Sequence, residues 1–372
     1  MLKQLRTGVA AAFTVFMAAC ATVPEATEPP RPAEPDRPEP VEEPRREAPL
    51  RIGVVVSSTG SAVLQRYAEM VLDGARLGAD QAGTDRRQVE LVIRDDGGTA
   101  AGATRAVREL EAAGVRHIVG PLLDESVSAA ASARSGEGTL IISPTAVAQP
   151  TMTRNVYALN VVDTRGATAL GEYARRYGRV GVLYPRSPDQ TQQARAFMEA
   201  YRAGGGAVTD AGFDPGSTNV TAQLGQLRQA RVEAIFFPGT ERHLQLVLPQ
   251  IDYAGLGAVQ MLGTETWLSD ALRGAPQRVI EGAIVATPLW QDSPELAWQE
   301  FVRQYENRYR RSLDNPIAAL GYDAVLLAVR AADGQASGDY RGATGVMNVQ
   351  PEGITRKPFL VRIQSGRLVP VH

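Results

Sequence analysis

Small hydroxyl residues follow several apolar runs of the chain, in places where they could hold an anion. They are Ser58 and Thr59 after the run Arg51 to Val56, Ser126 after the run His117 to Val119, and Ser143 and Thr145, with Ala146, after the run Thr139 to Ile142. Hydroxyls and free backbone N–H groups at such turns suit a carboxylate, helped by the dipole of a helix. Glu265, in LGTETW, could pair with an ammonium group. Together they predict a site for a small zwitterion, although each alone is more often a cap or a turn residue.

Two of these runs are expected to frame one wall of a ligand cleft. His117 to Val119 and Thr139 to Ile142 are too short and too close to Gly and Pro to be helices, so they predict buried strands. A helix is expected between them from Glu125 to Ser135, capped by Asp124. Ligands of open parallel sheets sit beyond the carboxyl ends of strands, where the turns GPLLDES and SPTA would lie.

Strands and helices alternate along the rest of the chain. The strand Arg51 to Val56, a helix from Val63 to Ala82 and the strand Val89 to Arg94 begin the pattern. Such alternation predicts a parallel sheet with helices on both faces. After Asp163 the alternation restarts and predicts a second sheet of the same kind. The tail, through 358–363 and 368–371, predicts a closing β-hairpin.

The composition excludes several classes of function. With 372 residues, 44% hydrophobic and 22% charged, the chain is long enough for two packed units, and its net charge of -2 gives no basic field for nucleic acid. A single cysteine and three scattered histidines predict neither an intrachain disulfide nor a metal site. The sequence has no GxSxG, GxxxxGK[ST] or HExxH motif, so we expect neither a cofactor nor an enzyme.

Residues 1–49 predict a targeting signal followed by a tether. Lys3 and Arg6 precede an apolar run, Val9 to Ala19, that is too short to span a bilayer, so residues 1–19 predict a cleaved signal peptide. The run ends in MAAC, which resembles the bacterial lipobox, so Cys20 is expected to carry acyl chains; the alternative is a buried or stray thiol. Residues 20–49 are rich in Pro and Glu and predict a disordered spacer with a reach on the order of 90 Å.

The order of six motifs resembles that of a known family. VGPLLDESVSAAA, LIISPTA, VGVLYPRSPDQ, AIFFPG, MLGTETW and NPIAALGYDAVLLA follow one another as in the type I periplasmic-binding proteins, in the branch similar to leucine/isoleucine/valine-binding proteins. The resemblance covers nearly all of 50–372. It implies an α/β fold of two Rossmann-like lobes with parallel sheets and a ligand cleft between them. Lobe 1 would comprise 50–162 with 288–342, and lobe 2 would comprise 163–287 with 343–372, with crossings near 161–163, 286–289 and 342–347.

The resemblance also implies roles for particular residues. In amino-acid binders of this family, a serine after the third strand and groups after the fourth hold the ligand carboxylate, and an acid of the second lobe holds the amine. Ser126, Thr145 and Glu265 match these positions. Val147 stands where a second hydroxyl is usual, and Asp189 and Thr240 stand where aromatic residues are usual, which weakens the amino-acid assignment.

Two functions follow from the resemblance. The first is a lipid-anchored periplasmic solute-binding protein that captures an amino acid or similar zwitterion for the permease of an ABC importer. The second is an outer-membrane lipoprotein that activates penicillin-binding proteins by protein contact, because VGPLLDESV and GTETW are also similar to motifs of that domain. Ala21 stands where an Asp would retain many lipoproteins at the inner membrane, so either membrane of the cell envelope could hold Cys20.

Overall fold

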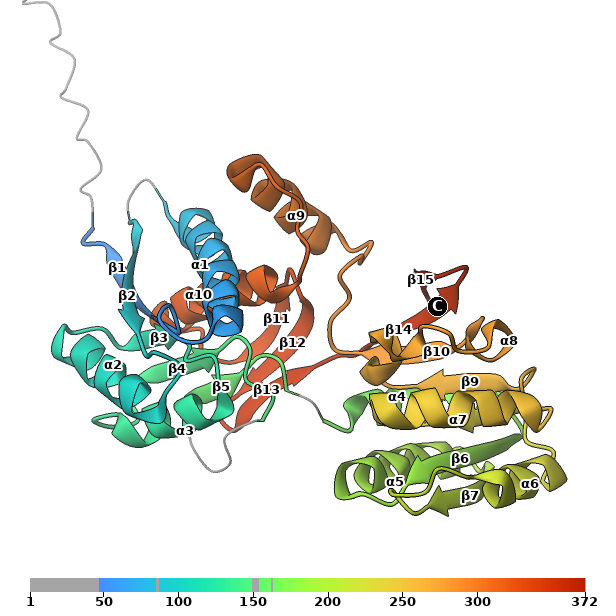
Figure 1. Cartoon of the computed structure of the whole chain (residues 1–372). Helices are drawn as coiled ribbons and strands as arrows, with labels where there is room; N and C mark the ends of the chain where they lie inside the picture. The colour runs from blue at the N-terminus through green and yellow to red at the C-terminus, as the bar shows by residue number, and fades with distance from the viewer. Residues whose placement is uncertain (1–46, 85–86, 149–153, 162, 372) are drawn as a thin grey trace, which may run out of the picture. The chain divides into compact units, whose positions relative to one another are not determined.

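The computed structural model describes residues 47–84, 87–148, 154–161 and 163–371. The predicted signal peptide, Cys20 and nearly all of the predicted tether lie outside these residues. Among the described helices, none combines the length and the apolar character that crossing a bilayer requires. The chain builds two lobes around separate sheets, as the alternation of strands and helices predicts (Figure 1).

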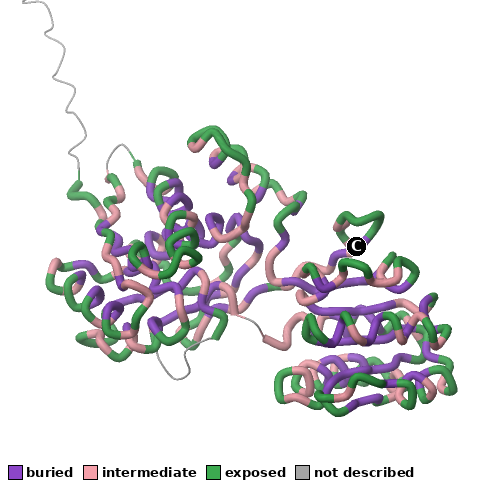
Figure 2. The backbone as a smooth tube through the Cα atoms, in the orientation of Figure 1, coloured by how far each residue is buried: buried purple, intermediate pink, exposed green. Residues whose placement is uncertain are grey.

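The first lobe contains a five-stranded sheet in which every neighbouring pair is parallel, in the order β2-β1-β3-β4-β5. Its strands are β1 (Leu50–Val56), β2 (Val89–Asp95), β3 (His117–Val119), β4 (Leu140–Ser143) and β5 (Val156–Ala158). One face packs against α1 (Ala62–Ala82) and α10 (Ile317–Ala332), and the other against α2 (Ala100–Ala112) and α3 (Asp124–Ala133). The strands β3, β4 and β5 and most of β1 are buried, the edge strand β2 is partly exposed, and the outer faces of the helices are exposed (Figure 2).

Glycines allow the backbones of α1 and α10 to cross at close range. A Cβ atom added at Gly74 would lie 1.7 Å from the carbonyl oxygen of Ala318, and one added at Gly321 would lie 2.4 Å from the carbonyl oxygen of Val71. No side chain can occupy such a gap, so only glycine permits the two backbones to meet here.

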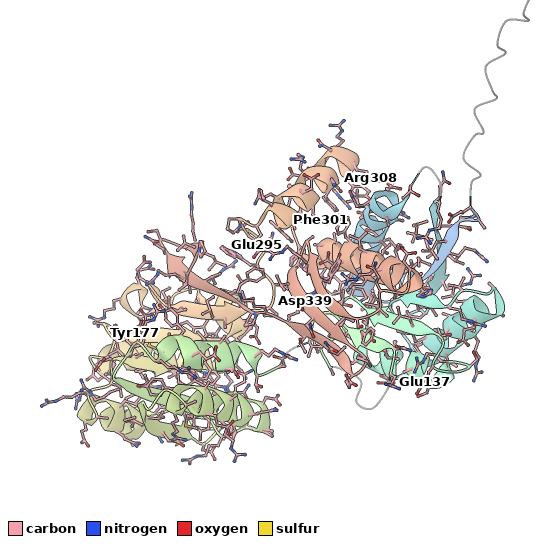
Figure 3. The ribbon with its side chains drawn as sticks, turned by 180° about the vertical axis from the view of Figure 1, so that it is seen from behind. Glu137, Tyr177, Glu295, Phe301, Arg308 and Asp339 are labelled. Carbon is pink, nitrogen blue, oxygen red and sulfur yellow. The ribbon has the colours of Figure 1, made fainter. Side chains whose placement is uncertain are left out.

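Helix α9 (Leu296–Tyr309) extends the first lobe through an aromatic face. Phe301 is buried, and the centre of its ring lies 5.1 Å from that of Tyr322 on α10. Arg308, further along α9, pairs with Asp80 of α1 (Figure 3). The helix therefore binds to the α1–α10 pair through an apolar contact and an ion pair.

The second lobe contains a seven-stranded sheet in the order β15-β14-β10-β9-β8-β6-β7. Its strands are β6 (Arg179–Pro185), β7 (Ala207–Phe213), β8 (Ala234–Phe236), β9 (Gln260–Gly263), β10 (Ile284–Thr287), β14 (Phe359–Gln364) and β15 (Arg367–Pro370). The five strands β6 to β10 are parallel. β14 and β15 form the predicted closing hairpin, in which β14 pairs with β10 antiparallel and β15 pairs with β14 antiparallel. The helices are α4 (Arg165–Ala174), α5 (Pro188–Arg202), α6 (Thr221–Gln229), α7 (Glu241–Tyr253) and α8 (Gln277–Ile280), with 3-10 turns η1 (Glu265–Leu268) and η2 (Asp270–Leu272).

A small antiparallel sheet was not predicted. It consists of β11 (Gly338–Gly342), β12 (Gly345–Gln350) and β13 (Gly353–Arg356). Alternate residues of β12 are buried, and Met347, Val349 and Ile354 pack in the core of the first lobe. Residues 345–356 therefore belong to the first lobe, and the third crossing follows Arg356. The boundary expected at 342–347 is wrong, because the alternate buried residues of this segment pack in the core of the first lobe.

A buried charged network lies where the chain makes this crossing. The carboxylate of Asp323, on α10, accepts hydrogen bonds from the backbone N–H groups of Ala343 and Thr344, both at 2.8 Å, and from the Thr344 hydroxyl. Arg356 donates through Nη1 to the Thr344 carbonyl at 3.0 Å and to its hydroxyl at 2.9 Å, and through Nε to the carbonyl of Leu159. Burial lowers the pKa of Arg356 to about 10, so the guanidinium stays charged at neutral pH.

We expect Asp323→Ala to reduce the free energy of unfolding by about 3 to 5 kcal/mol, because it leaves Arg356 buried without the carboxylate that offsets its charge. Urea denaturation measures the change. Asp333→Ala, at the C-terminal cap of the same helix, is the matched control, since the surface pair of Asp333 with Arg87 contributes roughly 0 to 1 kcal/mol. Equal effects of the two substitutions would show that the network does not stabilise the fold.

Candidate ligand-binding site

The loop after β4 is tied to the loop after β3 by two of the predicted ligand-binding hydroxyls. Ser143 Oγ donates to the carbonyl of Pro121 at 2.6 Å and accepts from the N–H of Ala146 at 3.1 Å. Thr145 Oγ1 donates to the carbonyl of Leu122 at 2.7 Å. Both hydroxyl protons are thus bound to backbone carbonyls within the first lobe.

Asp124 joins the same two loops. Its Oδ1 accepts from the N–H groups of Val147 at 3.0 Å and Ala148 at 3.1 Å. The prediction that Asp124 caps the helix is wrong, because the cap residue of α3 is Leu123 and no side chain makes the capping bond. Ser126 is buried in the first turn of α3. Sequence reasoning missed the bond between Asp124 and the β4 loop, since nothing in the sequence pairs residues so far apart.

The loop after β1 is held by Asp95, the acid that ends β2. Thr59 donates to Asp95 through its backbone N–H at 3.2 Å and through its hydroxyl, whereas Ser58 is exposed. Burial of Asp95 would raise its pKa, but the hydrogen bonds from Thr59 and from the N–H of Gly97 lower it below the ordinary value. The Thr59 side chain is therefore already paired with a carboxylate of its own lobe.

Glu265 lines a small cavity beside the segments that cross from one lobe to the other. It begins η1 directly after β9 and lines the cavity with Asp163, Arg165 and Arg356. The cavity has a volume of about 20 Å³, which is room for about one water molecule. Burial raises the pKa of the Glu265 carboxyl; its own backbone N–H opposes the rise, and the charge of Asp163 adds to it. A half-buried carboxylate with a raised pKa is a good partner for a cation that replaces its lost hydration.

The charges around Glu265 are only partly balanced. Arg165 pairs with Asp163, to which its backbone N–H also donates at 2.7 Å. Arg356 is 8% exposed, and its Nη2 is buried with no hydrogen-bond partner among the described atoms. Sequence reasoning did not identify Asp163 or Arg356, because each is a single charged residue brought to the cavity by the crossings.

The two remaining predicted residues do not line this cavity. Asp189 is exposed in the first turn of α5. Thr240 is the N-terminal cap of α7, where its hydroxyl accepts from the N–H of His243 at 3.5 Å and lies 2.7 Å from His243 Nδ1. Both follow strands of the second sheet at the edge where Glu265 follows β9, so they share an edge with Glu265 but not its cavity.

Among the described residues, no cluster of three His, Cys, Asp or Glu side chains could hold a metal ion.

Comparison with known proteins places the chain in a family. Residues 49–347 match the family model described as "Periplasmic binding protein". Leu/Ile/Val-binding protein homolog 3 of Brucella melitensis is 24% identical over 238 residues, which cover 59% of this chain and 64% of that protein. The leucine-, isoleucine-, valine-, threonine- and alanine-binding protein of Pseudomonas aeruginosa is 24% identical over 249 residues, covering 64% and 66%. The matched regions thus span less than two thirds of these relatives' own lengths.

Solved structures show the same fold with different ligands. A substrate-binding protein of an ABC transporter from Desulfitobacterium hafniense, in complex with Leu, has a TM-score of 0.65 and 20% identity, covering 87% of this chain and 100% of its own. A solute-binding protein from Rhodopseudomonas palustris, in complex with 3,4-dihydroxybenzoic acid, has a TM-score of 0.56 and 16% identity, covering 87% and 96%. The predicted two-lobe fold is confirmed, whereas the ligand varies within it.

The named relatives are solute-binding proteins, and none of them is an enzyme, in agreement with the expectation from the sequence. The family model covers most of this chain, including both parallel sheets and the first two crossings. The chain belongs to the periplasmic binding protein family.

Proposed function

We propose that the chain is a lipid-anchored solute-binding protein of an ABC importer and that its solute carries an ammonium group. The observation that carries the proposal is the half-buried carboxylate of Glu265, whose pKa is raised by burial, at the edge of the second sheet. An ammonium group would donate charge-assisted hydrogen bonds to this carboxylate. The names of the relatives, which refer to Leu, Ile and Val, support an amino-acid-like solute.

The expected affinity follows from the number of such bonds. Hydrogen bonds to charged groups contribute roughly 1.5 to 3 kcal/mol each. Two or three of them, together with burial of an apolar side chain, support a binding free energy of about -8 kcal/mol, which corresponds to a dissociation constant of about 1 μM. Loss of the Glu265 charge should therefore be measurable.

A second candidate function is regulation of a penicillin-binding protein by direct contact, without tight binding of a small solute. It is favoured by the hydrogen bonds within the first lobe, because Ser143, Thr145 and Asp124 have their partners in the lobe itself. A thermal-shift panel of amino acids and cell-wall fragments separates the two functions, since a ligand at 100 times its Kd stabilises by about 2.7 kcal/mol. No shift across the panel, with a synthase recovered by pull-down, would favour the second function.

We expect Glu265→Gln to weaken binding of any ammonium-bearing solute by about tenfold or more, which calorimetry measures. Gln has nearly the same shape but cannot offset the charge of the solute. The variant should stay folded at pH 7, because it replaces a carboxyl whose burial opposes ionisation. Thr240→Ser, at the same edge of the sheet but outside the cavity, is the control. Unchanged affinity in Glu265→Gln would remove this residue from the site.

The affinity should also fall at low pH. An ammonium group stabilises the ionised form of Glu265, so the pKa of Glu265 in the complex lies below its raised pKa in the free protein. Affinity is then full above the free-state pKa and decreases as the pH falls through it, by up to about tenfold per pH unit. Calorimetry across this range in wild type should show the decrease, and Glu265→Gln should not. A decrease of the same size in both proteins would assign the titration to another group.

The proposed anchor is Cys20, with its acyl chains in a membrane of the cell envelope and the globular part facing the periplasm. The sequence MAAC and the membership of a periplasmic family support it. We expect Cys20→Ser to abolish acylation, with the chain shifting from the membrane to the soluble fraction of cells. Mass spectrometry of the mature N-terminus and fractionation check this, with Ala21→Ser as the control. Acylation retained in Cys20→Ser would overturn the anchor.

A further inference from the structure

The second sheet ends in an edge strand, β15, which pairs only with β14 among the described strands (Figure 1). The carbonyl of Leu360 accepts from the N–H of Val371 at 3.0 Å, so the backbone groups of Val371 face β14. Because backbone groups of successive strand residues point to opposite sides, those of Leu368, three positions earlier, face outward. Ile363, which lies opposite Leu368, agrees with this pattern, since its N–H donates to the carbonyl of Ala283 on the β10 side. Leu368 therefore presents one N–H and one carbonyl to the free edge of the sheet.

A groove lies beside this edge, on the face of the sheet that Leu368 shares with Ile363. Its other wall comes from η1, η2 and α8, and its volume of about 750 Å³ is within the range of about 300 to 1,000 Å³ that is usual for ligand sites. The side chain of a residue paired with Leu368 on an added strand would lie on the same face and enter this groove. The apolar lining, which packs in or against the core of the second lobe, consists of Trp267, Leu268, Leu272, Ile280, Ile363 and Leu368.

The charges at the rim of the groove indicate what else an occupant carries. Asp270 and Arg273 pair with each other at 2.9 Å. Arg367 is exposed and has no ion pair with a described residue. An acid opposite Arg367 on an added strand would form a cross-strand pair with it, whereas an acid inside the groove would face Asp270 and Asp292. In an antiparallel strand the residue opposite Arg367 directly follows the residue opposite Leu368, so the matching sequence is an apolar residue followed by an acid.

We infer that this edge binds an extended peptide segment of a partner protein, which adds to β15 as an antiparallel strand. Main-chain hydrogen bonds to Leu368 hold the segment, and the groove selects a large apolar side chain. β15 is four residues long and ends in Pro370, features that oppose edge-to-edge pairing with a second copy of this chain. The inference goes beyond the proposed function, because no residue lines both this groove and the cavity of Glu265.

The test titrates the peptide acetyl-TVTLEVT-amide into the isotope-labelled chain, which carries Cys20→Ser, and follows the amide signal of Leu368 by NMR. The signal should shift and saturate. N-methylation of the peptide's Leu removes the N–H that bonds to the Leu368 carbonyl, and it should weaken binding about tenfold. N-methylation of the adjacent Glu, whose N–H points away from β15, is the matched control and should leave the Kd unchanged. Equal Kd values for the three peptides, or no shift of Leu368 with millimolar peptide, would overturn the inference.

Two variants of the chain test the groove and its rim. Leu272→Ala should weaken binding about tenfold by removing apolar contact, while Tyr253→Ala, a 94% exposed residue of the same lobe outside the groove, should have no effect. Arg367→Glu, an exposed change that leaves the core intact, should weaken the peptide severalfold and prefer acetyl-TVTLKVT-amide. An unchanged preference in Arg367→Glu, or equal losses in Leu272→Ala and Tyr253→Ala, contradicts the inference. So does a Leu368 signal that follows dilution of the chain rather than peptide, which would assign the edge to a second copy.

Discussion

The fold depends on one buried charged contact, in which Thr344 links the carboxylate of Asp323 to the guanidinium of Arg356. The Thr344 hydroxyl accepts from the cation and donates to the anion, so neither charge is left without a partner. Through Nε, Arg356 also binds the carbonyl of Leu159, directly after β5. The contact thus joins α10, the turn between β11 and β12 and the start of the third crossing to the end of β5, which lies far from them in the sequence.

This contact also lies next to the candidate site, because Arg356 belongs to both. Arg356 uses Nε and Nη1 within the first lobe, and the same residue lines the cavity together with Glu265 and Asp163. The segments that connect the lobes therefore supply both the structural network and part of the polar lining. Glu265, in the second lobe, therefore lies next to the residues that fix the path of the chain out of the first.

The sequence predicts the architecture well, because it is encoded in local periodicity. Apolar runs between helices of ordinary length identify both parallel sheets, and the hairpin of β14 and β15 follows from the alternation near the end of the chain. The sheet of β11 to β13 was missed because its strands are short and separated by glycines, and the boundary of the first lobe was placed too early as a result. For the site, the position of Glu265 after a strand was predictable. The pairing of Asp124 with the β4 loop and the burial of Arg356 depend on tertiary contacts, which no local pattern reports.

The order of the elements has a consequence for how the chain folds during synthesis. The core of the first lobe includes α10 and β12, and the second sheet is completed by β14 and β15, of which β14 pairs with β10. Neither lobe is complete until the ribosome has released nearly the whole chain. Until then, the early strands of both sheets keep their apolar faces exposed. This state is compatible with export in unfolded form, but it favours aggregation when chaperones are absent.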